Sequence, residues 1–151
     1  MFKIASTILL LITILHLHPA HAEENIPLRT DSGLIKTEQL LASGNFTAAI
    51  NSADNVIKRH KNNADAFAYK AYAYYKLGEK ENALRNFKYA LKAYPNHLGA
   101  NKYLASIYID GGHIAQALEQ LQVIRMICGN SNCIEIEMIE REIDNHKKNK
   151  K

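Results

Sequence analysis

The chain has 151 residues, of which 19 are Lys or Arg and 15 are Asp or Glu, and its formal net charge is +4. Lys3 and four lysines within the last five positions carry this excess, so the rest of the chain holds 14 basic and 15 acidic residues. A nearly neutral body lacks the clustered positive charge of a nucleic-acid-binding face. We therefore expect no nucleic-acid partner.

The first 22 residues have the parts of an export signal. Lys3 gives a positive start, residues 4–15 form an almost unbroken apolar run, and Ala20 and Ala22 are the small residues that a signal peptidase reads. The apolar run is shorter than the roughly 20 residues that cross a bilayer as a helix. Cleavage after Ala22 is predicted, leaving 129 residues, which suffice for one domain in the periplasm or outside the cell without an integral membrane segment.

A 34-residue period follows a predicted linker at residues 23–29. Glycines recur at this spacing, and an alanine stands five residues after each of them. These residues are Gly44, Gly78, Gly112, Ala49, Ala83 and Ala117. A fixed period of this length is typical of stacked helix hairpins. It predicts three repeats, at residues 30–63, 64–97 and 98–131.

The middle repeat shows the hairpin pattern most clearly. Its second half carries an apolar stripe of helical period, formed by Ala83, Leu84, Phe87, Ala90 and Leu91. Gly78 is expected to end the first helix in a left-handed conformation, and Pro95 to close the second.

Residues 64–97, ADAFAYKAYAYYKLGEKENALRNFKYALKAYPNH, resemble the tetratricopeptide repeat. The residues that stand at the family's large, small and turn positions are Phe67, Ala71, Tyr74, Gly78, Ala83, Phe87, Ala90 and Pro95. The resemblance covers about two-thirds of the chain and implies an all-α fold, an α-solenoid of three such hairpins plus a capping helix. The sequence departs from the family pattern at Gly33, Lys70 and Asn101, where larger apolar residues are usual, and at Lys61 and Gly129, which replace the closing proline.

The C-terminal segment predicts the cap. Residues 132–147 alternate isoleucine and methionine with acidic residues and Arg141, as in an amphipathic helix that covers the last hairpin, and residues 148–151 form a basic tail. Cys128 and Cys133, the only cysteines, flank a Gly-Asn-Ser-Asn turn. Export to an oxidising compartment favours a structural disulfide between them over a redox pair, which normally has the spacing Cys-x-x-Cys.

No motif for catalysis or for metal binding stands out. The chain has no phosphate-binding glycine loop, no nucleophile elbow and no His-Glu-x-x-His. The histidines outside the signal, His60, His97, His113 and His146, fall at predicted helix ends without ligand spacing, and we expect them to be solvated. The sequence predicts a protein that is not an enzyme and that has no cofactor or metal.

The family resemblance also implies a concave groove, lined by the first helix of each repeat, that holds a protein or peptide. The groove positions, transferred to this sequence, are Leu34, Glu38, Leu41, Ala68, Tyr72, Tyr75, Lys76, Lys102, Ser106, Ile109 and Asp110. Only Lys102 fits the family's carboxylate clamp well. Tyr72 and Tyr75 are either anchors for a partner or packing against the next hairpin.

These observations favour a non-enzymatic adaptor or assembly factor that binds its partner in the groove. One alternative is a structural accessory subunit that binds an envelope complex through its convex face, and another is an enzyme whose site no motif reveals. The lysine tail is expected to complement the dipole at the end of the cap helix, and a weak contact with anionic membranes is the alternative.

Overall fold

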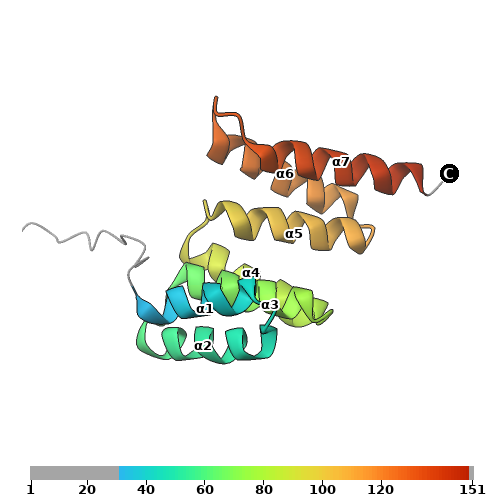
Figure 1. The fold of residues 1–151 in the computed structure, drawn as a ribbon. Coiled ribbons are helices and arrows are strands. Elements are labelled where there is room, and N and C mark those ends of the chain that lie inside the picture. Colours follow the sequence, from blue (N-terminus) through green and yellow to red (C-terminus); the bar gives the residue numbers. More distant parts are fainter. Residues whose placement is uncertain (1–30, 150–151) are drawn as a thin grey trace, which may run out of the picture.

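The computed structural model describes residues 31–149, so the predicted signal, the linker, Lys150 and Lys151 lie outside the described residues. Within this range the chain forms seven helices and no strand. The helices are α1 (Ser32–Ala42), α2 (Phe46–Arg59), α3 (Ala64–Lys76), α4 (Lys80–Ala93), α5 (Leu98–Asp110), α6 (Ile114–Cys128) and α7 (Ile134–Lys148). Figure 1 shows them stacked as successive hairpins, with α7 closing the far end, so the predicted all-α solenoid fold is confirmed.

The glycine period sets the turns of the hairpins. Gly44, Gly78 and Gly112 have φ angles of 74°, 78° and 74°, which only glycine adopts readily, and each follows the first helix of its hairpin. The first helices of the second and third hairpins begin at Ala64 and Leu98, at the first residue of the predicted repeats.

Side chains cap the first helix of each hairpin. Asp31 Oδ1 accepts a hydrogen bond from the Gly33 N–H at 2.6 Å, and Asn63 Oδ1 accepts one from the Ala66 N–H at 2.8 Å. His97 Nδ1 has the same role for Ala100 at 3.2 Å, 34 positions after Asn63. Because the first backbone N–H groups of a helix have no partner inside it, each cap stabilises the start of its hairpin.

We expect Asp31→Ala to lower the free energy of unfolding at neutral pH by about 1 kcal/mol, because the N-cap is lost. Burial raises the pKa of Asp31, but the hydrogen bond from the Gly33 N–H and the Arg59 guanidinium together hold it below its ordinary value. A carboxylate with a lowered folded-state pKa stabilises the protein above its unfolded pKa of about 3.9 and loses this effect as pH falls through the folded value. Urea unfolding should therefore show the difference between variant and parent shrinking below about pH 4. A difference that stays constant in acid would contradict the assignment.

Three residues inside helices depart from the repeat pattern, and a contact of each residue explains the departure. A Cβ on Gly33 would lie 2.8 Å from Val56 Cγ2 and from Arg59 Nη2, so the glycine allows α1 to approach α2 closely. Asn101 is 2% exposed, and its side-chain amide donates to the carbonyls of Pro95 at 2.9 Å and His97 at 3.0 Å. The His97 carbonyl also accepts the Asn101 backbone N–H at 3.1 Å, so the bond to the Pro95 carbonyl is the one that an apolar side chain could not replace.

Lys70 is the third departure from the repeat pattern inside a helix. Its Nζ lies 2.6 Å from Asp54 Oδ1, so a pair of opposite charges joins α3 to α2 at the position where the family usually has leucine.

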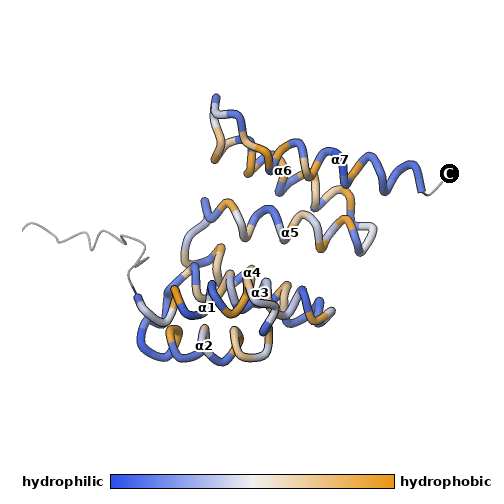
Figure 2. The backbone as a smooth tube through the Cα atoms, viewed as in Figure 1, coloured by the Kyte–Doolittle hydropathy of each residue, from blue (hydrophilic) through white to orange (hydrophobic). Residues whose placement is uncertain are grey.

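The core combines small and large side chains in layers. Ala71, Ala83 and Ala90 are fully buried where α3 and α4 meet, and Phe87 fills the space beside them with no exposed area. Figure 2 shows hydrophobic and hydrophilic residues alternating along the helices, as expected when each helix buries one side.

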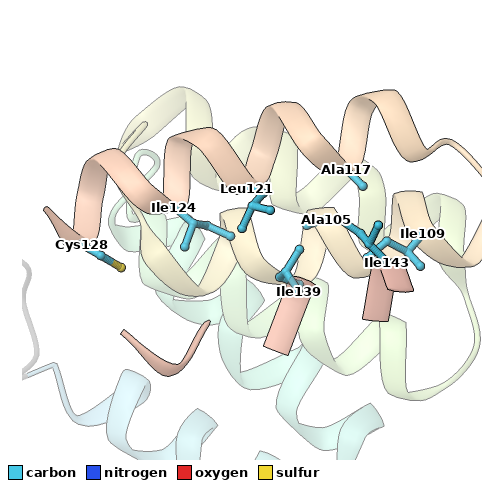
Figure 3. Close-up of a cluster of buried hydrophobic side chains, with 8 residues drawn as sticks. All are labelled: Ala105, Ile109, Ala117, Leu121, Ile124, Cys128, Ile139 and Ile143. Atoms are coloured by element: carbon cyan, nitrogen blue, oxygen red, sulfur yellow. The ribbon is translucent and has the colours of Figure 1, made fainter. Parts of the chain in front are cut away.

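The cap helix α7 completes the last core. Ile139 and Ile143 are buried against Leu121 and Ile124 of α6 and Ile109 of α5, as Figure 3 shows. The helix runs from Ile134 to Lys148, beginning two residues later and ending one later than the predicted 132–147.

A disulfide ties α7 to the helix before it. Cys128 is the last residue of α6, and Cys133 occupies the N-cap of α7. Their sulfurs are bonded and their Cα atoms are 5.9 Å apart, within the usual range for a disulfide. The cap is therefore held both by its apolar face and by a covalent link.

Candidate functional site

The predicted groove residues lie on α1, α3 and α5, the first helices of the hairpins, which pack side by side in sequence order. Burial divides them into two groups. Leu34, Ala68, Ser106 and Ile109 are 3%, 6%, 9% and 5% exposed, respectively, and pack into the interior. Neighbouring helices therefore cover these four side chains, although the family resemblance assigned them to the groove.

The remaining groove residues keep solvent contact. Glu38, Lys76 and Asp110 are exposed, and Leu41 and Lys102 are partly exposed. Asp110 Oδ2 lies 3.3 Å from Lys80 Nζ, an exposed ion pair that joins the end of α5 to the start of α4. The part of the predicted groove that keeps solvent contact is therefore mainly polar.

Tyr72 and Tyr75 form a cluster with a third tyrosine, Tyr103 of α5. The ring centroids of Tyr72 and Tyr75 lie 4.7 Å and 6.1 Å from that of Tyr103, and Phe87 stacks on Tyr103 at 5.7 Å. The tyrosines are only partly buried. They therefore pack against the next hairpin, as one of the two sequence interpretations held, and part of each side chain remains exposed. We call Tyr72, Tyr75 and Tyr103 the tyrosine cluster.

Sequence reasoning missed Tyr103, although a signal was present. Tyr103 stands 34 residues after Tyr69, so both occupy the same position of the repeat. That position was not among those transferred from the family groove, and only the packing of α5 against α3 shows that Tyr103 meets Tyr72.

Burial and neighbouring groups raise the pKa of two members of the tyrosine cluster, Tyr75 and Tyr103. Burial raises the pKa of Tyr103 to about 12, with further contributions from Tyr72 and Tyr75. Burial also raises the pKa of Tyr75, and the carboxylates of Asp110 and Glu142 raise it further. Both effects disfavour the ionised form of the Tyr75 hydroxyl.

Glu142 brings the cap helix to this region. Its Oε2 accepts a hydrogen bond from Ser106 Oγ at 2.8 Å, so α7 contributes a carboxylate beside a predicted groove position. Lys102 Nζ lies 4.3 Å from the centroid of the Tyr103 ring, so a cation also contacts the cluster. Glu142 could not be assigned from the repeat pattern, because it lies in the cap.

The histidines occupy helix ends as predicted, but they are not all solvated. His97 Nε2 lies 3.1 Å from Asp65 Oδ1 while its Nδ1 caps α5, and both groups are partly buried. His60 pairs with Asp31 at 3.3 Å, and His146 Nε2 is buried without a hydrogen-bond partner. Within residues 31–149 no three His, Cys, Asp or Glu side chains are grouped as metal ligands.

A depression lies between α1 and α2, lined by residues other than those of the tyrosine cluster. Polar residues such as Asn51, Ser52, Asn55 and Lys36 line it. It is wide open, and we assign no chemistry to it.

The arrangement defines a class of protein, a scaffold of stacked helix hairpins with an aromatic and polar face on its first helices. Two family models described as tetratricopeptide repeat match residues 39–97 and 81–127, which together span more than half of the chain. The chain belongs to the tetratricopeptide-repeat family, a protein-interaction fold, and no catalytic family is indicated. No match was found among curated proteins.

Solved structures show the same fold at low sequence identity. The TPR2B domain of yeast Sti1 in a pHsp70 complex is 20% identical with a TM-score of 0.69, over 78% of this chain and 94% of that one. The Yersinia enterocolitica type III secretion chaperone SycD, in complex with a peptide of the translocator YopD, is 13% identical with a TM-score of 0.70, over 81% and 95%. The second TPR domain of human RPAP3, in complex with the HSP70 peptide SGPTIEEVD, is 17% identical with a TM-score of 0.65, over 77% and 92%.

None of the helices in residues 31–149 combines the length and apolar character that a membrane span requires.

Proposed function

We propose that this protein is a non-enzymatic adaptor or assembly factor that holds a peptide segment of a partner protein against its first helices. The tyrosine cluster carries this proposal. Its rings are already fixed by Phe87 and by one another, so a partner can bury aromatic surface with little loss of side-chain freedom. The similar folds of Sti1, SycD and RPAP3, each solved with a bound partner, support the same use of the scaffold.

The second part of the proposal is location. The signal at residues 1–22 directs the chain to the periplasm or the exterior, where the Cys128–Cys133 disulfide would persist. N-terminal sequencing of the protein from its native source should begin at Glu23, and a product that retains the apolar run would overturn the proposed cleavage.

A structural accessory role is the second candidate, and exposed apolar residues on the second helices favour it. Tyr89 and Tyr94 are 49% and 54% exposed at α4 and its C-terminus, and Met126 of α6 is 73% exposed. Apolar side chains on the face opposite the first helices could contact a large assembly.

Site-specific photocrosslinking separates the two candidates. A photoreactive residue is placed at Glu38 or Lys76 on the first helices and, for comparison, at Tyr89 or Tyr94. These side chains are exposed, so the fold should tolerate the changes. The proposed function predicts partner adducts in the native compartment from Glu38 and Lys76. Adducts from Tyr89 and Tyr94 alone would favour the accessory role.

A further inference from the structure

Positive charge collects on the exposed side of α4, although the body of the chain is nearly neutral. No Asp or Glu occurs between Glu81 and Asp110. Within that stretch the exposed residues of α4 recur at the spacing of one helix face, while the buried residues form the other side. The exposed residues are Arg85, Lys88, Tyr89 and Lys92, followed by Tyr94 at the C-cap. We call these five residues the α4 face.

The three cations of the α4 face have no carboxylate partner. Within residues 31–149 none of them forms an ion pair, and Arg85 Nη2 donates to the neutral Asn82 side chain at 2.9 Å. Lys80, at the start of the same helix, is instead paired with Asp110 at 3.3 Å. Glu81 lies in the first turn, where it complements the helix dipole. The positive charge of the α4 face is therefore unbalanced.

Two tyrosines stand among these cations. Tyr89 and Tyr94 are 49% and 54% exposed. The Tyr89 ring lies 5.4 Å from that of Phe67, and the Tyr94 ring lies 6.4 Å from that of His97, so each ring has a neighbour on one side. The adjacent carboxylate of Asp65 already pairs with His97 Nε2 at 3.1 Å. The α4 face therefore combines aromatic surface with cations.

From this combination we propose that the α4 face docks the protein on the surface of a membrane that contains anionic lipids. Successive cations stand about one helical turn, roughly 5 Å, apart along the axis, so each can meet a different headgroup. Tyrosine rings suit the boundary between headgroups and hydrocarbon, and lysine and arginine are attracted to anionic lipids. The helix dipole accounts for Lys92 in the last turn, but not for Arg85 or for the tyrosines.

The inference goes beyond the proposed function, because none of the groove residues lies on α4. Docking through the α4 face leaves the first helices free to hold a partner. It also differs from the membrane contact of the lysine tail, which belongs to the end of α7 and the residues after it.

Flotation of the purified protein with lipid vesicles tests the docking. One set of vesicles contains phosphatidylglycerol and phosphatidylcholine in equal parts, and the other contains phosphatidylcholine alone. We expect the protein to float with the anionic vesicles only and to be released at high salt, because salt screens the attraction between exposed charges.

The double variant Lys88→Gln/Lys92→Gln should bind the anionic vesicles about tenfold more weakly, since each cation near an anionic surface adds to the affinity. Lys36→Gln/Arg141→Gln is the matched control. It removes the same charge from exposed positions of α1 and α7, and it should bind nearly as the parent does. Circular dichroism of both variants confirms that the helices remain folded.

Tyr89→Trp supplies a probe at one position, because the chain contains no tryptophan. Its emission should move to shorter wavelength when anionic vesicles are added, as the ring leaves water. An emission that stays unchanged while the protein floats would show that another surface makes the contact, and this would overturn the proposal.

Three further results would overturn it. The parent protein fails to float with anionic vesicles, or Lys88→Gln/Lys92→Gln floats as the parent does, or deletion of residues 147–151 alone abolishes flotation and so assigns the contact to the lysine tail. If flotation fails while crosslinks from Tyr89 and Tyr94 reach a protein, the α4 face serves a protein partner instead. None of these results bears on peptide binding by the first helices, which is measured separately.

Discussion

Replacing Phe87 with alanine is expected to lower the free energy of unfolding by about 3–5 kcal/mol, the usual cost of deleting a buried aromatic side chain. Phe87 has no exposed surface, packs among the alanines of α3 and α4, and stacks on Tyr103 of the next hairpin. The change therefore opens a cavity inside one hairpin and removes a contact between two. Because neighbouring hairpins stabilise each other in a solenoid, the loss should be felt by the whole stack.

Urea unfolding followed by circular dichroism measures this effect. Tyr89→Ala is the matched control, since Tyr89 lies on the same helix and is 49% exposed. It should cost about 1 kcal/mol or less, mainly through its ring contact with Phe67. Equal losses for Phe87→Ala and Tyr89→Ala would contradict the assigned core.

Removing the Cys128–Cys133 disulfide is the second large change, with an expected loss of roughly 2 kcal/mol. The closed loop is short, since five positions separate the cysteines, so the restriction of the unfolded chain is modest. The structural effect should be local. The link holds the start of α7, whose Ile139 and Ile143 seal the last core, so amide exchange should accelerate first in α7.

Thermal unfolding with and without a reducing agent, together with the Cys128→Ser/Cys133→Ser double variant, tests this. The reductant should lower the melting temperature of the parent and leave that of the double variant unchanged. A parent that is insensitive to reductant, with both thiols free under native conditions, would show that the cap is held by packing alone.

The sequence predicted the fold well because the repeat depends on local chemistry. Glycine is needed where φ is near +75°, so the recurrence of Gly44, Gly78 and Gly112 fixed the register of every hairpin. The apolar period then determined which side of each helix is buried, and the cap was visible as an amphipathic segment at the end of the register.

The candidate site was less predictable because it depends on distances between helices. Leu34 and Ile109 stand at groove positions of the repeat, yet adjacent helices cover them to 3% and 5% exposure. Tyr103 meets Tyr72, and Glu142 bonds to Ser106, only through the packing of α5 on α3 and of α7 on α5. A repeat pattern predicts which face of a helix carries a residue, but it does not predict how much of that face the neighbouring helices cover.

The departures from the repeat pattern also depend on contacts between helices. Gly33 is explained by Val56, and Lys70 by Asp54, a residue of another helix in each case. Lys70 and Asp54 belong to different repeats, so the ion pair between them can be recognised only once the hairpins are stacked.

Nuclear magnetic resonance mapping of a bound peptide on the ¹⁵N-labelled protein tests the central claim most directly. If the first helices bind the partner, the amide shifts should cluster on α3, α5 and the adjoining face of α7, including Lys76, Lys102 and Glu142. Shifts confined to α4 and α6, around Tyr89, Tyr94 and Leu118, would place the partner on the opposite face and contradict binding by the first helices.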